Sequence, residues 1–289
     1  MTARVVCVGL ATVDLIQRVD RIPDVDDKVE AGSAELAAGG PATNAAITAA
    51  ALGAEVTLVS AVGAHALGAL IRDDLATYGV GLLDATPTAT AVPPVSAVTV
   101  LAGTGGRSIV SRNARGTEVP APPELAPVLA RADVVLVDGH HPALAVTAAR
   151  AGRPLVVDAG SWRPVFADIL PHADVVACSA TFHHPDLPGP AAIRGLGARH
   201  VAVTDGPGPV RWFTAGASGE VPVPPVMVVD TAGAGDVFHG ALAVAAAGGL
   251  PPAELPAALA YAVTVAGIRV GHAGPRTWLA DPRLAELRR

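Results

Sequence analysis

The chain has 289 residues, of which 51% are hydrophobic and 16% charged, so it can bury a large core as one or two α/β domains. Its net charge of −6 argues against nucleic acid or a membrane surface as a partner. Cys7 and Cys178 lie far apart, which excludes a disulfide framework and fits a reducing compartment. Because the chain opens on a strand-like run and charges interrupt its apolar runs, we expect a cytoplasmic protein.

Short Val-rich runs alternate with Ala-rich runs along the chain. The Val-rich runs predict buried strands and the Ala-rich runs predict helices, so strand-helix-strand units and a parallel sheet are expected. The predicted strands are 4–10, 55–63, 132–139, 154–160, 173–179 and 200–206, and the predicted helices include 41–52, 65–78, 142–151 and 190–198.

Two segments break this alternation. Residues 15–37 mix polar and apolar side chains, and residues 95–113 form two alternating runs around "AGTGG", which predicts a hairpin. Both segments are expected to form a small sheet that protrudes from the main fold, as a lid or as a dimer contact. With no linker rich in Pro, Gly or Ser, the sequence predicts one domain over 1–289 with this lid inserted.

Several predicted strands end in polar residues or glycine, at Asp138, Asp158, Ser179 and Thr204. Each of these could be an ordinary turn former. Because ligands of open α/β sheets bind at the carboxyl ends of strands, the four together indicate a ligand crevice.

The stretch "DTAGAGDVFHGAL", residues 230–242, places glycines and Asp236 where an apolar helix begins. Lys28 is the only lysine, which excludes a phosphate loop of the G-x-x-x-x-G-K type. Unpaired amide groups and the helix dipole would bind an anion here without a cationic side chain. Asp236 could then accept a proton from an attacking hydroxyl, or it could simply cap the helix.

A second Gly-rich stretch comes earlier in the chain. Gly39 and Gly40 precede the predicted helix over 41–52, and Asn44 lies in its first turns. An amide side chain both donates and accepts hydrogen bonds, as sugar hydroxyls require. A helix residue of no special role is the alternative for Asn44.

These two stretches resemble the two motifs of the ribokinase-like carbohydrate kinases, the PfkB family. The resemblance implies a three-layer α/β/α sandwich with a mostly parallel central sheet and a small β-sheet lid. It also implies an ATP-dependent sugar kinase, with a nucleoside kinase or a non-catalytic sugar or nucleotide sensor of the same fold as alternatives. A dinucleotide-binding dehydrogenase is disfavoured, because no G-x-G-x-x-G follows the first strand.

The resemblance implies roles for individual residues. Asp236 matches the catalytic base, and the amides of Gly233, Ala234 and Gly235 match the anion hole. The residues implied to bind the sugar are Asp14, Gly39, Gly40 and Asn44. His140 is expected to be a loop histidine that could also line the sugar pocket. The residues implied to bind ATP are Ser179, Thr204, Asp205, Gly206, Gly208, Val265, Ala266, Gly267 and Gly271.

Metal ions enter through the same resemblance. Mg²⁺ would accompany ATP, and Asp230 would lie near a monovalent-cation site, such as a K⁺ site, seen in some members. The N-x-x-E motif of many members is absent, since "CSATFH" stands there with Ser179 and Phe182. Mg²⁺ would therefore be held mostly by ATP phosphates and water.

Some details are similar to ketohexokinases and related ketose kinases. "IPDVDD" resembles their acidic lid segment and makes Asp26 a candidate sugar contact. "GGRSIVSRN" resembles the same branch, so Arg112 and Asn113 could reach the substrate from the lid, with a solvent-facing side chain as the alternative for Arg112. A ketose such as fructose is the expected acceptor, and a homodimer through the lid is the expected assembly.

Overall fold

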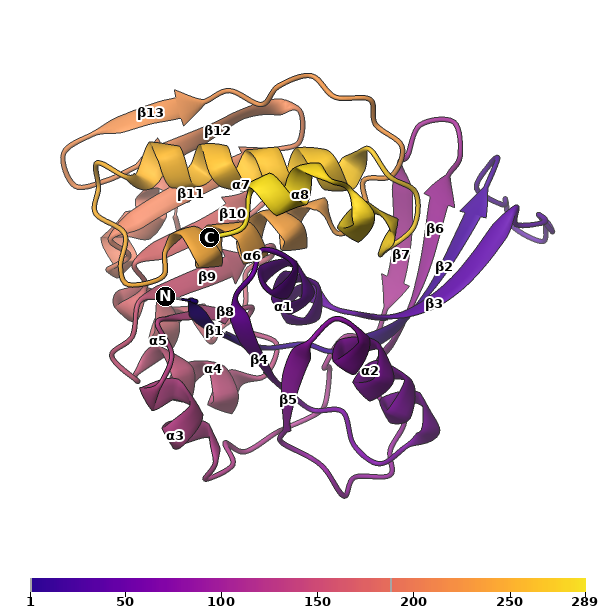
Figure 1. The fold of residues 1–289 in the computed structure, drawn as a ribbon, viewed down its shortest axis with the longest axis horizontal. Helices are drawn as coiled ribbons and strands as arrows, with labels where there is room; N and C mark the ends of the chain where they lie inside the picture. Colours follow the sequence, from indigo (N-terminus) through magenta and orange to yellow (C-terminus); the bar gives the residue numbers. More distant parts are fainter. Residues whose placement is uncertain (1, 188) are drawn as a thin grey trace.

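The computed structural model describes residues 2–187 and 189–289. A nine-stranded sheet in the order β13-β12-β11-β10-β9-β8-β1-β4-β5 forms the centre (Figure 1). The strands from β11 to β5 run parallel, and β12 and β13 are antiparallel at one edge. Their bounds are β1 (Arg4–Val8), β4 (Glu55–Ser60), β5 (Val80–Asp84), β8 (Val134–Val137), β9 (Leu155–Ala159), β10 (Val175–Ser179), β11 (His200–Asp205), β12 (Gly208–Phe213) and β13 (Ser218–Val221).

Helices cover both faces of this sheet, which gives the expected α/β/α sandwich (Figure 1). One face carries α1 (Pro41–Ala51), α2 (Ala66–Thr77), α6 (Ala234–Ala245), α7 (Leu255–Val270) and α8 (Arg283–Glu286); the other carries α3 (Leu125–Ala130), α4 (Pro142–Ala149) and α5 (Phe166–Ile169). Successive residues of a strand point to opposite faces, so Val5 and Cys7 enter one core while Val6 and Val8 enter the other. Burial on both faces explains why the strands are nearly continuous Val-rich runs.

A separate four-stranded sheet, in the order β3-β2-β6-β7, protrudes at one side of the molecule (Figure 1). Its strands are β2 (Thr12–Val19), β3 (Ser33–Gly39), β6 (Val95–Leu101) and β7 (Arg107–Ser111). The predicted hairpin is confirmed, since β6 and β7 are antiparallel neighbours. The strands extend beyond the predicted segment 15–37 at both ends, so Asp14 and Gly39 lie on the small sheet itself.

The six predicted strands and the helices at 41–52, 65–78 and 142–151 are confirmed, with ends that move by at most three residues. The α-helix predicted over 190–198 is wrong, because residues 190–196 form a 3₁₀ helix, η2 (Pro190–Leu196). Gly195 weakens an α-helix there, and Gly197 ends the segment with φ of 104°. Two further 3₁₀ turns are η1 (Leu170–His172) and η3 (Thr277–Ala280).

Within the described residues, no helix combines the length and the apolar character needed to cross a membrane.

Helices α1 and α6 cross at very short range. A Cβ atom on Gly240 would lie 2.5 Å from the carbonyl oxygen of Ala45 and 2.8 Å from Cβ of Thr48. Ala45, Ala241 and their neighbours in both helices are fully buried. The small residues of the two motifs therefore let two distant segments of the chain pack backbone against backbone.

We predict that Gly240→Ala destabilises the protein, because the added methyl group overlaps α1. The expected loss is about 1–3 kcal/mol in the free energy of unfolding, measured by chemical denaturation. Gly267→Ala in α7 is the matched control, since its Cβ would meet only Val226 Cγ1 at an ordinary 3.7 Å. Equal stability of the Gly240 variant and the wild type would contradict the close packing.

Candidate active site

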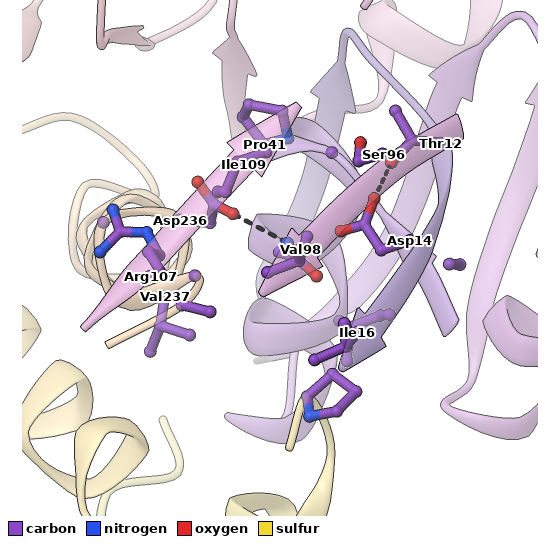
Figure 2. Close-up of a pocket in the computed structure, with 18 of the residues that line it drawn as sticks. Thr12, Asp14, Ile16, Pro41, Ser96, Val98, Arg107, Ile109, Asp236 and Val237 are labelled. Atoms are coloured by element: carbon purple, nitrogen blue, oxygen red, sulfur yellow. Dashed lines mark hydrogen bonds between the residues drawn. The ribbon is translucent and has the colours of Figure 1, made fainter. Parts of the chain in front are cut away.

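A cavity of about 260 Å³ lies where the small sheet faces the N-terminal ends of α1 and α6. Figure 2 shows the carboxylates of Asp14, from β2, and Asp236, from α6, among the residues that line it. The predicted residues that it brings together are Asp14, Gly40, Asn44, Asn113, Asp230, Gly233, Gly235 and Asp236.

Asp236 lies in the first turn of α6, behind the N-cap residue Gly233. Its Oδ2 accepts a hydrogen bond of 2.8 Å from Nδ2 of Asn44, on α1. Burial, and then the nearby carboxylate of Asp158, raise the pKa of Asp236 to about 6. At neutral pH this carboxylate is ionised, yet it is a stronger base than an exposed aspartate.

The start of α6 offers backbone donors to an anion. Gly233 has φ of 71°, in the left-handed region, and a Cβ on Gly235 would meet nothing within 4 Å. Ala234 N donates a long hydrogen bond of 3.4 Å to the carbonyl oxygen of Thr231. For the residues described, the hydrogen bonds include none from the amides of Gly233 and Gly235, which leaves these two donors for an anion.

Asp14 is held on the small sheet by its neighbours. Its Oδ1 accepts a hydrogen bond of 2.5 Å from Oγ1 of Thr12, and burial raises its pKa. A Cβ on Gly39 would overlap the Asp14 carboxylate, and a Cβ on Gly40 would overlap the carbonyl oxygen of Leu10. The Gly-Gly pair is thus needed for the close approach of backbone and carboxylate.

Arg276 is a residue of the cavity that the sequence analysis missed. One guanidinium nitrogen donates to Asn44 Oδ1 at 3.3 Å, and the other donates to Ala38 O at 2.6 Å and to Asp74 Oδ2 at 3.0 Å. It therefore fixes the amide orientation of Asn44, whose Nδ2 then faces Asp236. No motif surrounds Arg276 in the sequence, so nothing there could have singled it out.

Behind Asp236, a buried pair joins α6 to the sheet. His239 Nε2 donates to Ala177 O at 3.2 Å, which leaves Nδ1 without a proton in the neutral ring, 3.3 Å from Asp158 Oδ2. Burial, and then the charge of Asp138, raise the pKa of Asp158 to about 7. A protonated Asp158 can donate to His239, which keeps a second negative charge away from Asp236.

Four other predicted sugar contacts do not line this cavity, and one of them is Gly39, at the end of β3. Asp26 is exposed in the connection between β2 and β3, with φ of 64°. His140 and Arg112 line a second cavity, and Asn113 lines both cavities.

The residues predicted to bind ATP lie at the neighbouring strand ends and on α7. Ser179 and Thr204 are register partners at the ends of β10 and β11, and the turn at Gly206 has φ of 53°. The side chain of Val265 is fully buried in the core. The other predicted residues there are Asp205, Gly208, Ala266, Gly267 and Gly271.

An apolar segment that the sequence analysis missed lies beside α7. Val226, Met227 and Val228 are exposed by 42%, 83% and 46%. A Cβ on Gly267 would lie 3.7 Å from Val226 Cγ1, and one on Gly271 would lie 3.8 Å from Met227 O. Exposed apolar side chains next to glycines form a surface suited to a flat ring.

Asp230 does not fit the expected monovalent cation. Its Oδ2 accepts hydrogen bonds of 3.1 Å from both Arg269 and Gly274 N, and its Oδ1 accepts one of 2.8 Å from Ala232 N. The Arg269 guanidinium also donates to the carbonyl oxygens of Asp230 and His272, at 3.3 and 2.9 Å. The oxygens that a cation would use are thus held by a buried guanidinium.

A half-buried acid beside unpaired amides, at a cavity of about 260 Å³, is suited to phosphoryl transfer onto a hydroxyl. This defines the class as a phosphotransferase. The model of the pfkB family carbohydrate kinases matches residues 2–281, and the chain belongs to this family. It is an enzyme that transfers a phosphoryl group to an alcohol group.

Similar proteins agree with this family. The chain is 29% identical over 277 residues to a ribokinase of Bacillus subtilis, covering 92% of this chain and 93% of the relative. It is 30% identical over 288 residues to an ATP-dependent ribose-1-phosphate kinase of Halopiger xanaduensis, covering 95% and 94%. The solved structure of Arabidopsis thaliana ribokinase with ribose and ATP has the same fold, with a TM-score of 0.80, 24% identity and coverage of 99% of each chain. The finer similarity to ketohexokinases is not confirmed.

We predict that K⁺ does not stabilise this protein specifically, because Arg269 already neutralises Asp230. The melting temperature in KCl should equal that in tetramethylammonium chloride at the same ionic strength. Arg269→Ala should cost about 3–5 kcal/mol of stability, as expected when a buried carboxylate loses its partner. It should regain part of this in KCl, because K⁺ can then enter the oxygen cage.

Arg269→Lys is the companion variant if Arg269→Ala does not fold, since it keeps a positive charge. If K⁺ but not tetramethylammonium stabilised the wild type, the assignment of Arg269 as the cation that neutralises Asp230 would be overturned.

Proposed function

We propose that the protein phosphorylates a hydroxyl of a small sugar with ATP, using Asp236 as general base and the start of α6 as anion hole. The observation that carries the proposal is the half-buried Asp236 carboxylate, which lines the cavity and is held by Asn44 beside the open amides of Gly233 and Gly235. When bound, ATP supplies the γ-phosphoryl group that is transferred.

The acceptor site is proposed from the side chains of the first cavity. Asp14 accepts hydrogen bonds from sugar hydroxyls, and Asn44 donates or accepts one while its Nδ2 orients Asp236. Asp236 accepts the proton of the attacking hydroxyl. The small sheet excludes water by closing over the sugar, since it supplies Asp14 and the wall formed by Val98 and Ile109.

The nucleotide side is proposed from the start of α6, at the edge of the first cavity, and from residues beside α7. The amides of Gly233 and Gly235 donate to phosphoryl oxygens, and the apolar segment 226–228 with Gly267 and Gly271 forms a surface for the adenine ring. In the described part of the chain, no three His, Cys, Asp or Glu side chains are grouped to hold a metal. Mg²⁺ would therefore be carried mainly by phosphate oxygens and water.

The relatives support a pentose acceptor rather than the ketose expected from the lid. One of them is a ribokinase and another an ATP-dependent ribose-1-phosphate kinase, so both a neutral and a phosphorylated ribose are candidates. A coupled assay of ADP release over ribose, ribose 1-phosphate, ketoses and nucleosides tests the proposal. ADP release with none of them above the ATP-only rate would contradict it.

Asp236→Asn is predicted to lower kcat by roughly 10²–10⁴, the usual contribution of a positioned base. The amide still fits beside Asn44, so the melting temperature should change little. Asp73→Asn, an exposed change on α2, is the control and should keep full activity. A fully active Asp236→Asn would remove Asp236 from its proposed role.

The pH profile of kcat/KM is predicted to fall on the acidic side with an apparent pKa of about 6. Burial raises the pKa of Asp236 to about 6, and only the ionised carboxylate can accept a proton. The rate should therefore drop roughly tenfold per pH unit below this value and be level above it. The residual kcat/KM of Asp236→Asn should not fall in this way at acidic pH. A wild-type profile that stays level down to the pKa of an ordinary aspartate would argue against Asp236 as the general base.

A further inference from the structure

A second cavity, of about 1150 Å³, adjoins the acceptor cavity. Ser111 and Asn113, at the end of β7, line both, so they form the boundary between the two. The second cavity is closed by the loop after β7, by the start of α4, and by the segment that joins β9 to α5. A sugar with a hydroxyl at Asp236 could thus extend a substituent past Ser111 and Asn113.

The second cavity is positively charged although the chain is acidic. Among the described residues that line it are three arginines, Arg112, Arg115 and Arg163, against one acid, Asp168. Within the described part of the chain, none of these three arginines forms an ion pair with a carboxylate. In a protein with a net charge of −6, this is a local accumulation of guanidinium groups rather than part of a basic surface.

Arg163 is held in place by a buried histidine. One of its guanidinium nitrogens lies 2.6 Å from His140 Nε2, and His140 Nδ1 lies 3.1 Å from Asp138 Oδ1. Because a guanidinium can only donate, Nε2 of His140 accepts this hydrogen bond. The contact holds the guanidinium of Arg163 in place without placing a carboxylate against it.

Asp138 anchors this chain of contacts to the acceptor cavity. Its carboxylate accepts hydrogen bonds from Leu10 N at 2.8 Å and Ala42 N at 3.2 Å, in the segments that precede β2 and begin α1. A rigid connection thus runs from the backbone beside Asn44 to the guanidinium of Arg163. Arginine presents several N–H donors in a planar fork, which matches the oxygens of phosphate or sulfonate.

We propose that the second cavity binds an anionic substituent of the acceptor, a phosphate or sulfonate group, through Arg163 with Arg112 and Arg115. This rests on the proposed function and narrows its substrate to a sugar that already carries a negative group. A neutral sugar fills only the first cavity and leaves these guanidinium groups in water.

The test compares neutral sugars with their phosphate esters and sulfonate analogues in the coupled assay. We expect the wild type to prefer an anionic sugar over its neutral parent by roughly 10² or more in kcat/KM. Comparing the phosphate esters with the sulfonate analogues shows which of the two anionic groups the cavity binds. Arg163→Gln should reduce that preference at least about tenfold. Arg150→Gln, an exposed change at the end of α4 outside both cavities, is the matched control and should leave the preference unchanged.

Calorimetric titration with the sugar phosphates provides a readout that needs no turnover. The subsite is supported if a sugar phosphate binds to the wild type and binds more weakly to Arg163→Gln. If Arg163→Gln does not fold, Arg112→Gln, a change at an exposed residue, replaces it in the titration. Phosphorylation of neutral sugars in preference to anionic ones would overturn the subsite but keep the kinase. Equal losses for both kinds of sugar in Arg163→Gln, or no binding of any sugar phosphate, would also overturn the subsite.

Discussion

The hydrogen bond between Asn44 and Asp236 is the interaction on which the site depends. It joins α1, near the start of the chain, to α6, near its end, at 2.8 Å. The two helices can approach this closely because Gly240 leaves room for the backbone at Ala45. Arg276 holds the other end of the Asn44 amide, so the Asp236 carboxylate has one orientation relative to both the cavity and the amides of its own helix.

The buried acids of this protein fall into two kinds. Asp230 is compensated by Arg269, and Asp138 by hydrogen bonds from the backbone amides of Leu10, Ala42 and His140. Asp158 faces the ring of His239 and Asp236 accepts from the amide of Asn44, and burial raises the pKa of both. The compensated acids hold the structure around the cavity, while the uncompensated ones are poised to exchange protons near neutral pH.

The small sheet does more than cover the sandwich. It carries Asp14 on β2, and the end of β7 separates the two cavities. The chemistry belongs to α6 and therefore to the sandwich, whereas the walls around the acceptor belong largely to the small sheet. Changes of acceptor can then arise in the small sheet and its loops without disturbing the catalytic carboxylate.

The patterns of the sequence by themselves determined the alternating strands and helices of a parallel sheet, because Val-rich strands and Ala-rich helices follow periodicities that local side-chain direction enforces. The three-layer sandwich was expected only from the family resemblance. The sequence patterns also determined where α6 begins and that Asp236 lies in its first turn, since glycines and a carboxylate at a helix start are local features. The 3₁₀ segment at 190–196 was missed because a few glycines decide between two similar helical forms. Only the tertiary structure decided which side chains pair around the cavities. Arg269 contacts Asp230 across 39 residues of sequence, and Arg163 contacts His140 across 23. No local sequence pattern encodes such pairs.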